Sequence, residues 1–510
     1  MPAKFGWRTA WSSNFEALGH EVCRVSAAQA DLIVIGAGPA GVSAAVAASE
    51  CGLKVVLLDE QRAAGGQVYR AASSRIGEPT GDKVGDAKDQ DARNGDALRQ
   101  KLAGSAVQHL STTRIWSVTR NDLRFQVDAF GEDGPLTFEA TQLVAATGAY
   151  ERVVPFPGWT LPGVIGLAAA TVLLKSEQMI IGRRVVVAGC GPLLAAVAAK
   201  TLQRGAEFVA IVDLSAKSKW ISTLPRIATR PELLRQGLSW ATEILRHRVQ
   251  VYSGHAIRSA DGSDHVERVV LGPVGPDGAA QPGAEVEIDN IDALIVGHGL
   301  VPGAEITRLL GANHHFDRLR GGWVPTCDAM GRSSVPGLIA VGDGAGIRGA
   351  IPAILAGELA GLAAATDAKR APPDDVSDRV ERAAKNLRRS NAFSDGIADF
   401  LALKPAMVRD IADETIVCRC EDIPRHEIDA AIQAGAHEMN QLKHFTRCGM
   451  GPCQGRMCGD VVGELLAQHV GSREAAGYWT QRTPLRPVPL SDLIGDYTYA
   501  DVPIPAPAPL

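Results

Sequence analysis

The sequence predicts an α/β protein with two domains built around βαβ units and a small helical domain near its C-terminus. Two glycine-rich turns, each between a β-branched apolar run and an alanine-rich stretch, indicate βαβ units at residues 31–60 and 184–213. Five of the nine cysteines lie between residues 418 and 458. Clustered thiols in a cytosolic chain are more often metal ligands or redox groups than structural disulfides, so we expect a metal or redox site there.

Length and composition are those of an ordinary multidomain globular protein. The 510 residues suffice for about three domains. With 21% charged residues and a formal net charge of −5, the chain lacks the basic excess typical of nucleic-acid binding. The aliphatic runs are too short to cross a bilayer, and the N-terminus lacks the continuous apolar core of a signal peptide. We therefore expect a cytoplasmic location, with peripheral attachment at the inner face of the membrane left open, and no nucleic-acid partner.

The first βαβ unit carries a dinucleotide-binding fingerprint. An apolar strand, DLIVI, leads directly into the turn G-A-G-P-A-G, which comprises Gly36, Ala37, Gly38, Pro39, Ala40 and Gly41. Gly36 permits the tight turn, Gly38 lets the backbone approach a pyrophosphate, and Gly41 lets the helix pack on the strand. The helix N-terminus then offers free N–H groups to the phosphates.

The second strand of this unit ends in two carboxylates. Asp59 falls at the distance from Gly36 where a ribose-binding residue is expected, and Glu60 follows it. Neighbouring strand side chains point to opposite faces, so only one is placed to bind a ribose, and we favour Asp59. The alternative is that both are solvated charges at a strand end. Gly66 and Gln67 follow in a turn that resembles the glycine pair crossing the flavin dinucleotide in flavoproteins with two dinucleotide domains. No cysteine follows that pair, so the active disulfide of the lipoamide dehydrogenase type is missing.

Two later segments extend the pattern of a flavin domain. LVAATGAY places Thr147 and Gly148 in a turn that resembles the A-T-G element closing a flavin domain against its neighbour. VGDGAG places Gly342 and Asp343 before an alanine-rich helix, which resembles the flavoprotein element whose aspartate binds a ribityl hydroxyl. Asp343 as a plain helix cap is the alternative. The order of these parts predicts a flavin-binding domain, although the sequence leaves open whether the site holds FAD or only an adenine nucleotide.

The second βαβ unit is a degenerate repeat of the first. Gly189 and Gly191 are present, but Leu194 occupies the third glycine position, where a side chain presses on the helix packing or on a dinucleotide. Asp213 ends the next strand and suits an NAD ribose. A scaffold that has lost its ligand is a common outcome, because fold does not imply function. Binding of NAD(P) therefore stays uncertain, and we favour a structural, vacant or differently occupied domain.

The cysteine spacing indicates the kind of metal site. Cys418 and Cys420 form a C-x-C pair, and Cys448 and Cys453 form a C-x4-C pair beyond a helical run. Four thiolates from two loops can hold a tetrahedral zinc or a [2Fe–2S] cluster. Structural zinc sites usually use C-x2-4-C knuckles, so we favour a [2Fe–2S] cluster on these four residues. Zinc and unligated thiols remain alternatives, and Cys458 ranks second as a ligand.

The predicted organisation assigns each motif to a segment. The segments are an N-terminal extension (1–30), the first part of an FAD-binding domain (31–175), a second Rossmann-like domain (176–290), the second part of the FAD-binding domain (291–366), a linker with helices (367–415), a [2Fe–2S] domain (416–470) and a proline-rich tail (471–510). The amphipathic part of the linker is expected to tether or dock the cluster domain. The tail is not expected to have a core of its own.

The succession GAGPAG, GGQVYR, PFPGWTLPGV, VGDGAG and CRCEDI…TRCGMGPCQGRMC resembles the α subunits of the octopine and nopaline oxidases, which are opine oxidases. It is also similar to a hydrogen cyanide synthase subunit and to the α subunits of dye-linked proline and hydroxyproline dehydrogenases. The resemblance implies two Rossmann-like domains of the glutathione and thioredoxin reductase type with FAD. The C-terminal domain resembles bacterioferritin-associated ferredoxin (BFD), although that ferredoxin has C-x2-C as its second pair.

The same resemblance implies an oxidoreductase acting on CH–NH or CH–NH2 donors as one subunit of a heteromer. Its implied partners are an FAD-containing, amino-acid-oxidase-like β subunit, a small third subunit in some complexes, and an electron acceptor such as a quinone or dye. The leading hypothesis is thus an electron-transfer subunit of a dehydrogenase or oxidase for an opine or amino acid. The alternatives are a self-contained NAD(P)H-dependent FAD/[2Fe–2S] reductase and a zinc-stabilised interaction module. The catalytic residues are unknown, since no catalytic triad stands out.

Overall fold

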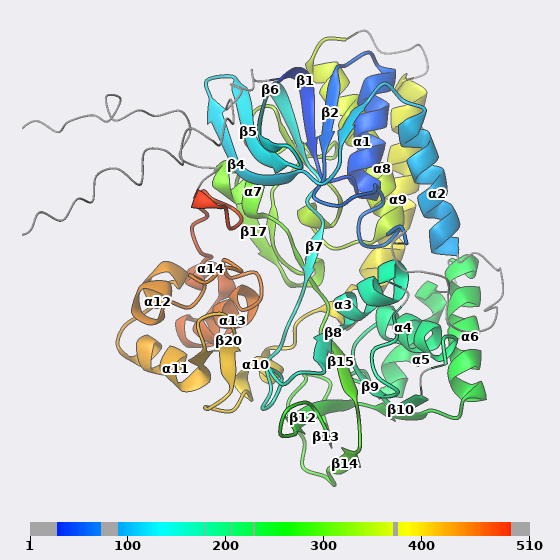
Figure 1. Cartoon of the computed structure of the whole chain (residues 1–510), viewed down its shortest axis with the longest axis vertical. Coiled ribbons are helices and arrows are strands. Elements are labelled where there is room, and N and C mark those ends of the chain that lie inside the picture. The colour runs from blue at the N-terminus through cyan, green and yellow to red at the C-terminus, as the bar shows by residue number, and fades with distance from the viewer. Residues whose placement is uncertain are drawn as a thin grey trace, which may run out of the picture.

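The computed structural model describes residues 28–72, 90–177, 179–205, 207–227, 230–370 and 376–490. Three bodies are visible in Figure 1: an upper α/β domain, a lower α/β domain, and a helical C-terminal domain beside them. The predicted N-terminal extension up to residue 27, residues 73–89, and the end of the proline-rich tail lie outside the described residues.

The upper domain is built on a seven-stranded sheet of order β3-β2-β1-β6-β5-β4, with β19 paired to β6. Strands β1, β2, β3 and β19 run parallel to their neighbours, whereas β4, β5 and β6 form an antiparallel meander. Their bounds are β1 Ala28–Ile35, β2 Val55–Leu58, β3 Gln108–Leu110, β4 Arg114–Asn121, β5 Arg124–Gly131, β6 Gly134–Ala145 and β19 Leu338–Ala340. Strand β6 is long enough to join the meander to the parallel sheet, so the antiparallel meander and the LVAATGAY strand are continuous.

Helices cover one face of this sheet. The bounds are α1 Pro39–Glu50, α2 Gln90–Ala103, α8 Ala350–Asp367 and α9 Val376–Leu401, and α8 packs against both α1 and α9. Glycines make the close approach of α1 and α8 possible, because a methyl group at Gly357 would lie 2.1 Å from the carbonyl oxygen of Ala40. On the opposite face of the sheet, Phe125 and Leu143 pack with Ile306 of α7 (Glu305–Leu309).

Helix α8 is the one described helix that is long and apolar enough to cross a membrane by length and composition. We expected every apolar run to be too short to cross a bilayer, and α8 is long enough to do so. In the structure 56% of the helix is buried inside the protein, and its contacts are with α1, α9 and β19. It serves as the central core helix of the upper domain.

The lower domain has a parallel five-stranded sheet of order β11-β10-β9-β15-β8. Its strands are β8 Val164–Gly166, β9 Arg184–Gly189, β10 Glu207–Asp213, β11 Gln250–Ser253 and β15 Ala293–Gly297, flanked by helices α3 Leu167–Val172, α4 Pro192–Leu202, α5 Lys217–Ile227 and α6 Pro231–Arg246. A short π-helix, Leu173–Glu177, extends α3, and an antiparallel sheet of β12 His255–Asp261, β13 Arg268–Pro273 and β14 Val286–Asp289 lies at its lower end (Figure 1). The lower sheet thus begins before residue 176 and ends after residue 290, because β8 and β15 pair within it.

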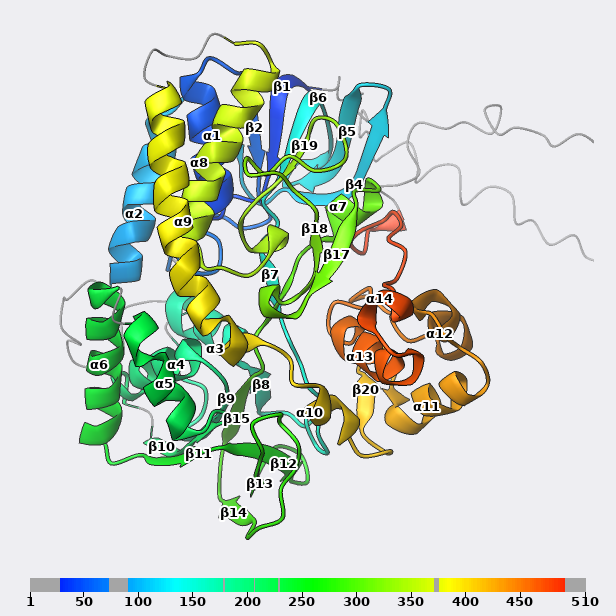
Figure 2. The same cartoon turned by 180° about the vertical axis from the view of Figure 1, so that it is seen from behind.

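A short ribbon lies where the chain crosses between the α/β domains, and it pairs β7 (Ala149–Glu151) with β16 (Leu300–Pro302). A second ribbon pairs β17 (His314–Asp317) with β18 (Gly322–Pro325) and contacts α14. Helix α9 then runs beside α8 and ends against α5 of the lower domain (Figure 2). The linker segment is therefore mostly one long helix that spans both α/β domains.

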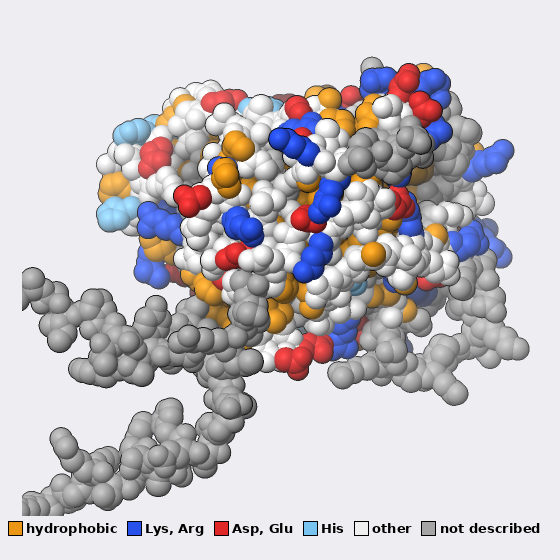
Figure 3. Space-filling view, turned by 90° about the horizontal axis from the view of Figure 1, so that it is seen from above, with side chains coloured by type: hydrophobic (Ala, Val, Ile, Leu, Met, Phe, Trp, Pro, Cys, Tyr) orange, Lys and Arg blue, Asp and Glu red, His pale blue; other side chains and the backbone are white. Residues whose placement is uncertain are grey.

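The C-terminal domain is a small helical unit. It contains α10 Pro405–Arg409, β20 Ile416–Cys418, β21 Ile423–Pro424, α11 Arg425–Gln433, α12 Met439–Thr446, α13 Gly459–Val470 and α14 Arg473–Ala476. Its core joins Val408 of α10 and Val461 of α13 to the buried thiols of Cys418, Cys448 and Cys458. On the face seen in Figure 3, basic and acidic side chains are interspersed, and hydrophobic side chains are scattered among them.

Candidate functional site

The glycine-rich turn after β1 has the backbone conformation that its sequence predicts. Gly36 has φ +100°, and a methyl group on it would lie 2.4 Å from the carbonyl oxygen of Ala146. A methyl group on Gly41 would lie 1.8 Å from the carbonyl oxygen of Gly36. Gly66 lies against the same turn, since a methyl group there would come within 3.0 Å of Gly38 Cα. Only glycine fits these positions, and the turn is left open for the close approach of a ligand.

The N-terminus of α1 is free of side-chain caps. The helix starts at Pro39, and its N-cap Gly38 offers no side-chain hydrogen bond, so the N–H groups of the first turn remain available. Asp59 is buried at the end of β2, and its carboxylate accepts the N–H of Ala37 and, at 2.6 Å, that of Gln61. Burial raises the pKa of Asp59. Glu60 is exposed at the surface. The residues present therefore fit the adenosine and pyrophosphate parts of a flavin dinucleotide, with Asp59 as the carboxylate that the turn encloses.

Two of the remaining predicted flavin residues, Gly342 and Thr147, lie against the same turn from distant segments. Gly342 has φ +70°, and a methyl group on it would lie 2.9 Å from Cβ of Ala40. Thr147 donates its hydroxyl hydrogen to the carbonyl oxygen of Gly303. Gly148 follows with φ +69°. Gln67 is exposed and accepts a hydrogen bond from Arg70 at 3.1 Å, so it does not point into the turn in this conformation.

Asp343 holds the backbone that leads into α8. Its Oδ1 accepts the backbone N–H groups of Arg348 and Gly349, both at 2.9 Å, just before α8 begins. Burial raises the pKa of Asp343. No described residue donates to Oδ2. One carboxylate oxygen thus holds the backbone just before α8, and binding of a ribityl hydroxyl by Asp343 stays a prediction.

All five C-terminal thiols lie together, and we call Cys418, Cys420, Cys448, Cys453 and Cys458 the cysteine group. The sulfur atoms are separated by 4.0 Å for Cys418–Cys420, 3.6 Å for Cys420–Cys453 and 3.9 Å for Cys448–Cys458. The buried thiols of Cys418, Cys448 and Cys458 lie within 4.8 Å of one another. The structure therefore brings the four predicted ligands together, and the Cys458 sulfur lies as close to its neighbours as theirs do.

These separations suit a tetrahedral metal centre. Metal–sulfur bonds of about 2.3 Å with tetrahedral angles put two thiolates on one metal about 3.8 Å apart. Cys420 and Cys453 form one such pair at the half-buried edge of the group. Cys418, Cys448 and Cys458 supply three thiols for the two positions on a second iron. A [2Fe–2S] cluster with four thiolate ligands therefore leaves one buried cysteine spare.

Replacing Cys418, Cys448 and Cys458 separately should identify the spare thiol. We expect one of the three serine variants to keep full iron and acid-labile sulfide, and the other two to lose both, because only two of the three buried thiols can ligate the second iron. Iron and sulfide assays with the visible spectrum of anaerobically purified protein would measure this. Loss of the cluster in all three variants, or its retention in more than one, would contradict the two-iron arrangement.

Trp479 was missed by the sequence analysis. It lies in the predicted proline-rich tail, yet only 5% of it is exposed, and its indole N–H donates to the carbonyl oxygen of Met439 at 2.8 Å. Its ring covers the loop between the last three cysteines, where a methyl group on Gly455 would lie 2.2 Å from the ring. Leu485 is buried as well, against the sheet of the upper domain. The first part of the tail is therefore packed, and the tryptophan in it was the available signal.

The degenerate second fingerprint is filled by the protein's own side chains. A methyl group on Gly191 would lie 2.7 Å from Cδ2 of Leu401, at the end of α9. Asp213 accepts the indole N–H of Trp220 at 2.7 Å, at the position where a ribose was expected. The Trp220 ring packs on Phe400 with 4.5 Å between ring centroids. The end of α9 and Trp220 thus occupy the groove that a pyridine nucleotide would need.

NADH and NADPH should accordingly fail to reduce the flavin of this protein. We expect no bleaching at millimolar nucleotide under anaerobic conditions, because Leu401 and Trp220 fill the groove. Stopped-flow absorbance near the flavin maximum would measure this, with dithionite as the positive control. Rapid bleaching by either nucleotide would show that the groove admits it, and would favour the self-contained NAD(P)H-dependent reductase.

A buried arginine joins the three domains at their meeting point. Arg152 is 2% exposed, and its Nε lies 2.7 Å from Oδ2 of Asp460, at the start of α13. Its other nitrogens donate to the carbonyl oxygens of Leu401, His298 and Gly321 at 2.7, 3.2 and 3.0 Å. One side chain therefore connects the cluster domain, the end of α9 and both α/β domains.

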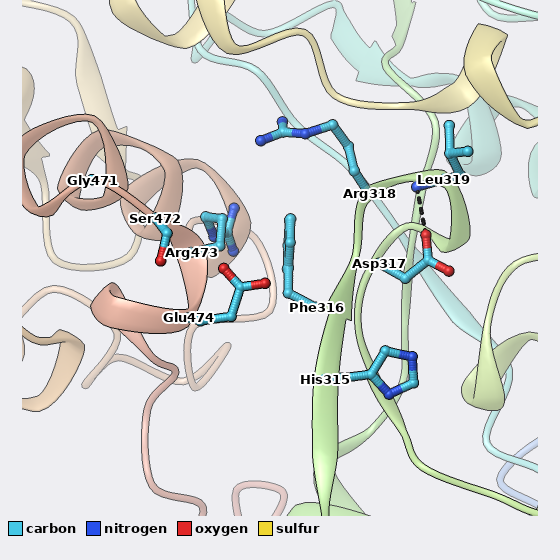
Figure 4. Close-up of a pocket in the computed structure, with 9 residues that line it drawn as sticks. All are labelled: His315, Phe316, Asp317, Arg318, Leu319, Gly471, Ser472, Arg473 and Glu474. Atoms are coloured by element: carbon cyan, nitrogen blue, oxygen red, sulfur yellow. Dashed lines mark hydrogen bonds between the residues drawn. The ribbon is translucent and has the colours of Figure 1, made fainter.

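The seam between the upper domain and the C-terminal domain is hollowed on its surface. A groove of about 530 Å³ runs between β17 and α14 (Figure 4). Phe316 lies between two guanidinium groups there, with Arg318 at 5.6 Å and Arg473 at 4.6 Å from its ring centroid. Arg318 also reaches Glu464 of α13 at 3.2 Å. These contacts add a second point of attachment between the two domains.

Comparison with protein families identifies the two parts of the chain. Residues 30–372 match the pyridine nucleotide-disulphide oxidoreductase family, and residues 416–468 match the BFD-like [2Fe-2S] binding domain. The glycine-rich turn and the cysteine group described above fall inside these two matches. The first match supplies an FAD-type dinucleotide domain, and the second supplies a [2Fe–2S] domain.

Whole-chain relatives include the opine oxidase A-subunit of Agrobacterium tumefaciens (strain Ach5), which is 33% identical over 91% of both chains. Hydrogen cyanide synthase subunit HcnB of Pseudomonas protegens is 30% identical over 90% of this chain and 96% of its own. Among solved structures, L-proline dehydrogenase from P. horikoshii has a TM-score of 0.65 at 19% identity, covering 92% of this chain and 80% of that chain. The last likeness shows the fold alone.

Proposed function

Because the chain belongs to the pyridine nucleotide-disulphide oxidoreductase family, and within it to the opine oxidase A-subunit family, we propose that it is the electron-transfer subunit of a heteromeric dehydrogenase or oxidase. The proposed substrate of the complex is an opine or an amino acid with a primary or secondary amine. The proposed partner is an FAD-containing β subunit that resembles amino-acid oxidases. A small third subunit and an acceptor such as a quinone complete the proposed assembly.

One observation carries this proposal. The same chain holds a flavin-type glycine turn and the cysteine group, while its own residues fill the groove that a pyridine nucleotide would use. A flavin takes up two electrons together, whereas a [2Fe–2S] centre passes them singly. A chain with both groups and no nucleotide groove suits electrons that arrive from a partner subunit.

The residues of this chain have positioning roles in the proposal. Asp59 and the first turn of α1 hold the adenosine and pyrophosphate end of the dinucleotide, and the free oxygen of Asp343 orients its ribityl chain. Trp479 covers the cysteine loop. Arg152 keeps the cluster domain seated on the α/β domains. None of these groups abstracts a proton from an amine, so substrate oxidation is assigned to the partner.

Coexpression with the neighbouring genes would test the division of labour. We expect the isolated chain to bind flavin and iron but to oxidise none of a panel of opines, proline, hydroxyproline and glycine. The purified complex should oxidise one of them and reduce the cluster of this chain, which anaerobic EPR spectroscopy would detect. Full activity of the isolated chain would refute the proposal, and so would a complex whose cluster stays oxidised during turnover.

A further inference from the structure

A small cavity lies between the upper domain and the cluster domain, separate from the glycine turn and from the cysteine group. It has a volume of about 60 Å³, which is room for a few waters or one small oxyanion. Tyr150, Glu305 and Arg308 line it from one side, and Arg456 and Asp460 line it from the other. It therefore lies at the junction that electrons would have to cross.

The lining residues are short of acceptors. Three buried N–H groups on them have neither a hydrogen bond nor an ion pair among the described residues: Arg308 Nε, Trp323 Nε1 and Arg473 Nε. No buried side-chain acceptor on the lining residues is left without a partner in the described part of the chain. Buried polar groups without partners destabilise the folded state. The imbalance calls for a ligand that supplies acceptors only.

Positive charges outnumber negative charges among the lining residues: there are three arginines and two carboxylates. Both carboxylates that line it are already engaged. Glu305 lies 3.0 Å from Arg456 and accepts the hydroxyl of Tyr150 at 3.1 Å. Asp460 lies 2.7 Å from Arg152 and 3.1 Å from Arg473.

Arg308 has no ion pair of its own among the described residues. None of them accepts a hydrogen bond from its side chain, which stacks on the Tyr478 ring at 4.5 Å from the centroid. Burial lowers the pKa of Arg308. A half-buried guanidinium whose Nε is buried, with a stacking partner but no anion in contact, suits recognition of a planar or tetrahedral oxyanion.

We propose that this cavity binds a small oxyanion, either inorganic phosphate or a carboxylate, with Arg308 as its principal ligand. The N–H groups of Arg308, Arg473 and Trp323 supply donors, and Arg456 supplies further positive charge. The site is linked to the cysteine group, because Arg456 donates to the carbonyl oxygen of Cys453 at 3.1 Å. A bound anion would offset positive charge beside the cluster and so lower its reduction potential.

The test uses the full-length protein with its flavin and cluster in place. Phosphate and acetate are titrated separately against sodium chloride of equal ionic strength, and the melting temperature and the midpoint potential of the cluster are recorded. We expect phosphate, acetate or both to raise the melting temperature and lower the potential where chloride does not. In Arg308→Met the affinity should fall by about tenfold to a hundredfold, which is the loss expected for charge-assisted hydrogen bonds.

The matched control is Arg419→Met, which removes a charge between Cys418 and Cys420 but does not line the cavity. It should keep the oxyanion response. If Arg308→Met does not fold, Trp323→Phe removes one donor, keeps an aromatic ring and should weaken binding in the same direction. Equal responses to oxyanions and chloride, or an unchanged response in Arg308→Met, would overturn the proposal. These outcomes leave flavin and iron content untouched, so they are distinct from a failure of the proposed electron-transfer role.

Discussion

Replacing Cys420 or Cys453 by alanine should abolish the iron–sulfur centre. Their sulfur atoms are 3.6 Å apart, and the other three thiols of the cysteine group gather on a separate, buried side. The spare thiol belongs to that buried side, so neither loss at the half-buried edge can be compensated. We expect iron and acid-labile sulfide to fall to background and the cluster absorbance to disappear.

The same variants should weaken the C-terminal domain. Cys418, Cys448 and Cys458 belong to its hydrophobic core, so loss of the cluster removes a cross-link that folding and ligation share. Limited proteolysis and thermal unfolding would measure the loss. Cys327→Ala is the matched control, because Cys327 lies outside the group and is half-buried. Normal iron content in Cys420→Ala or Cys453→Ala would contradict the assignment of a two-iron cluster to the cysteine group.

Replacing Arg152 by methionine should have the largest effect on stability. The substitution removes an ion pair to Asp460 at 2.7 Å and hydrogen bonds to three carbonyl oxygens, all at a site that is 2% exposed. Breaking a buried ion pair from one side costs about 3–5 kcal/mol. We expect a value near the lower end, because Arg473 still lies 3.1 Å from Asp460.

Denaturant unfolding followed by hydrogen exchange at the domain seam would measure this effect. The seam should lose protection before either domain core, since Arg152 contacts all three bodies. Arg332→Met is the matched control. Its pair with Asp367 at 2.8 Å is partly exposed, and such surface pairs contribute only about 0–1 kcal/mol. Equal destabilisation by the two substitutions would contradict the role given to Arg152.

Local motifs could be predicted from the sequence because each is encoded by consecutive residues. The turn from Gly36 to Gly41 needs only its own backbone conformation and the strand and helix beside it. The same holds for the pairing of Cys418 with Cys420, and for the placement of Asp59 at a strand end. The fold class and the two cofactor domains followed from the order of these motifs, and the family matches confirmed them.

Domain boundaries and contacts between distant segments could not be predicted from the sequence. Strand β15 continues the lower sheet although its sequence leads into the upper domain, because its pairing with β9 is a choice between neighbours far apart in the chain. The occupant of the second fingerprint could not be predicted either. Leu401 meets Gly191 across more than two hundred residues, and no periodicity in either segment marks that contact.

By itself, the sequence determined the fold class, the flavin-type turn and the presence of a multi-thiolate site, since these depend on local backbone geometry and side-chain chemistry. The tertiary structure alone decided that Cys458 joins the cysteine group, that Trp479 covers it and that α9 closes the nucleotide groove. It also placed Arg308 in a cavity between two domains, with no ion pair to any residue that the structure describes. Such contacts depend on how separate elements pack, and packing is settled by the sum of many weak interactions rather than by any one segment.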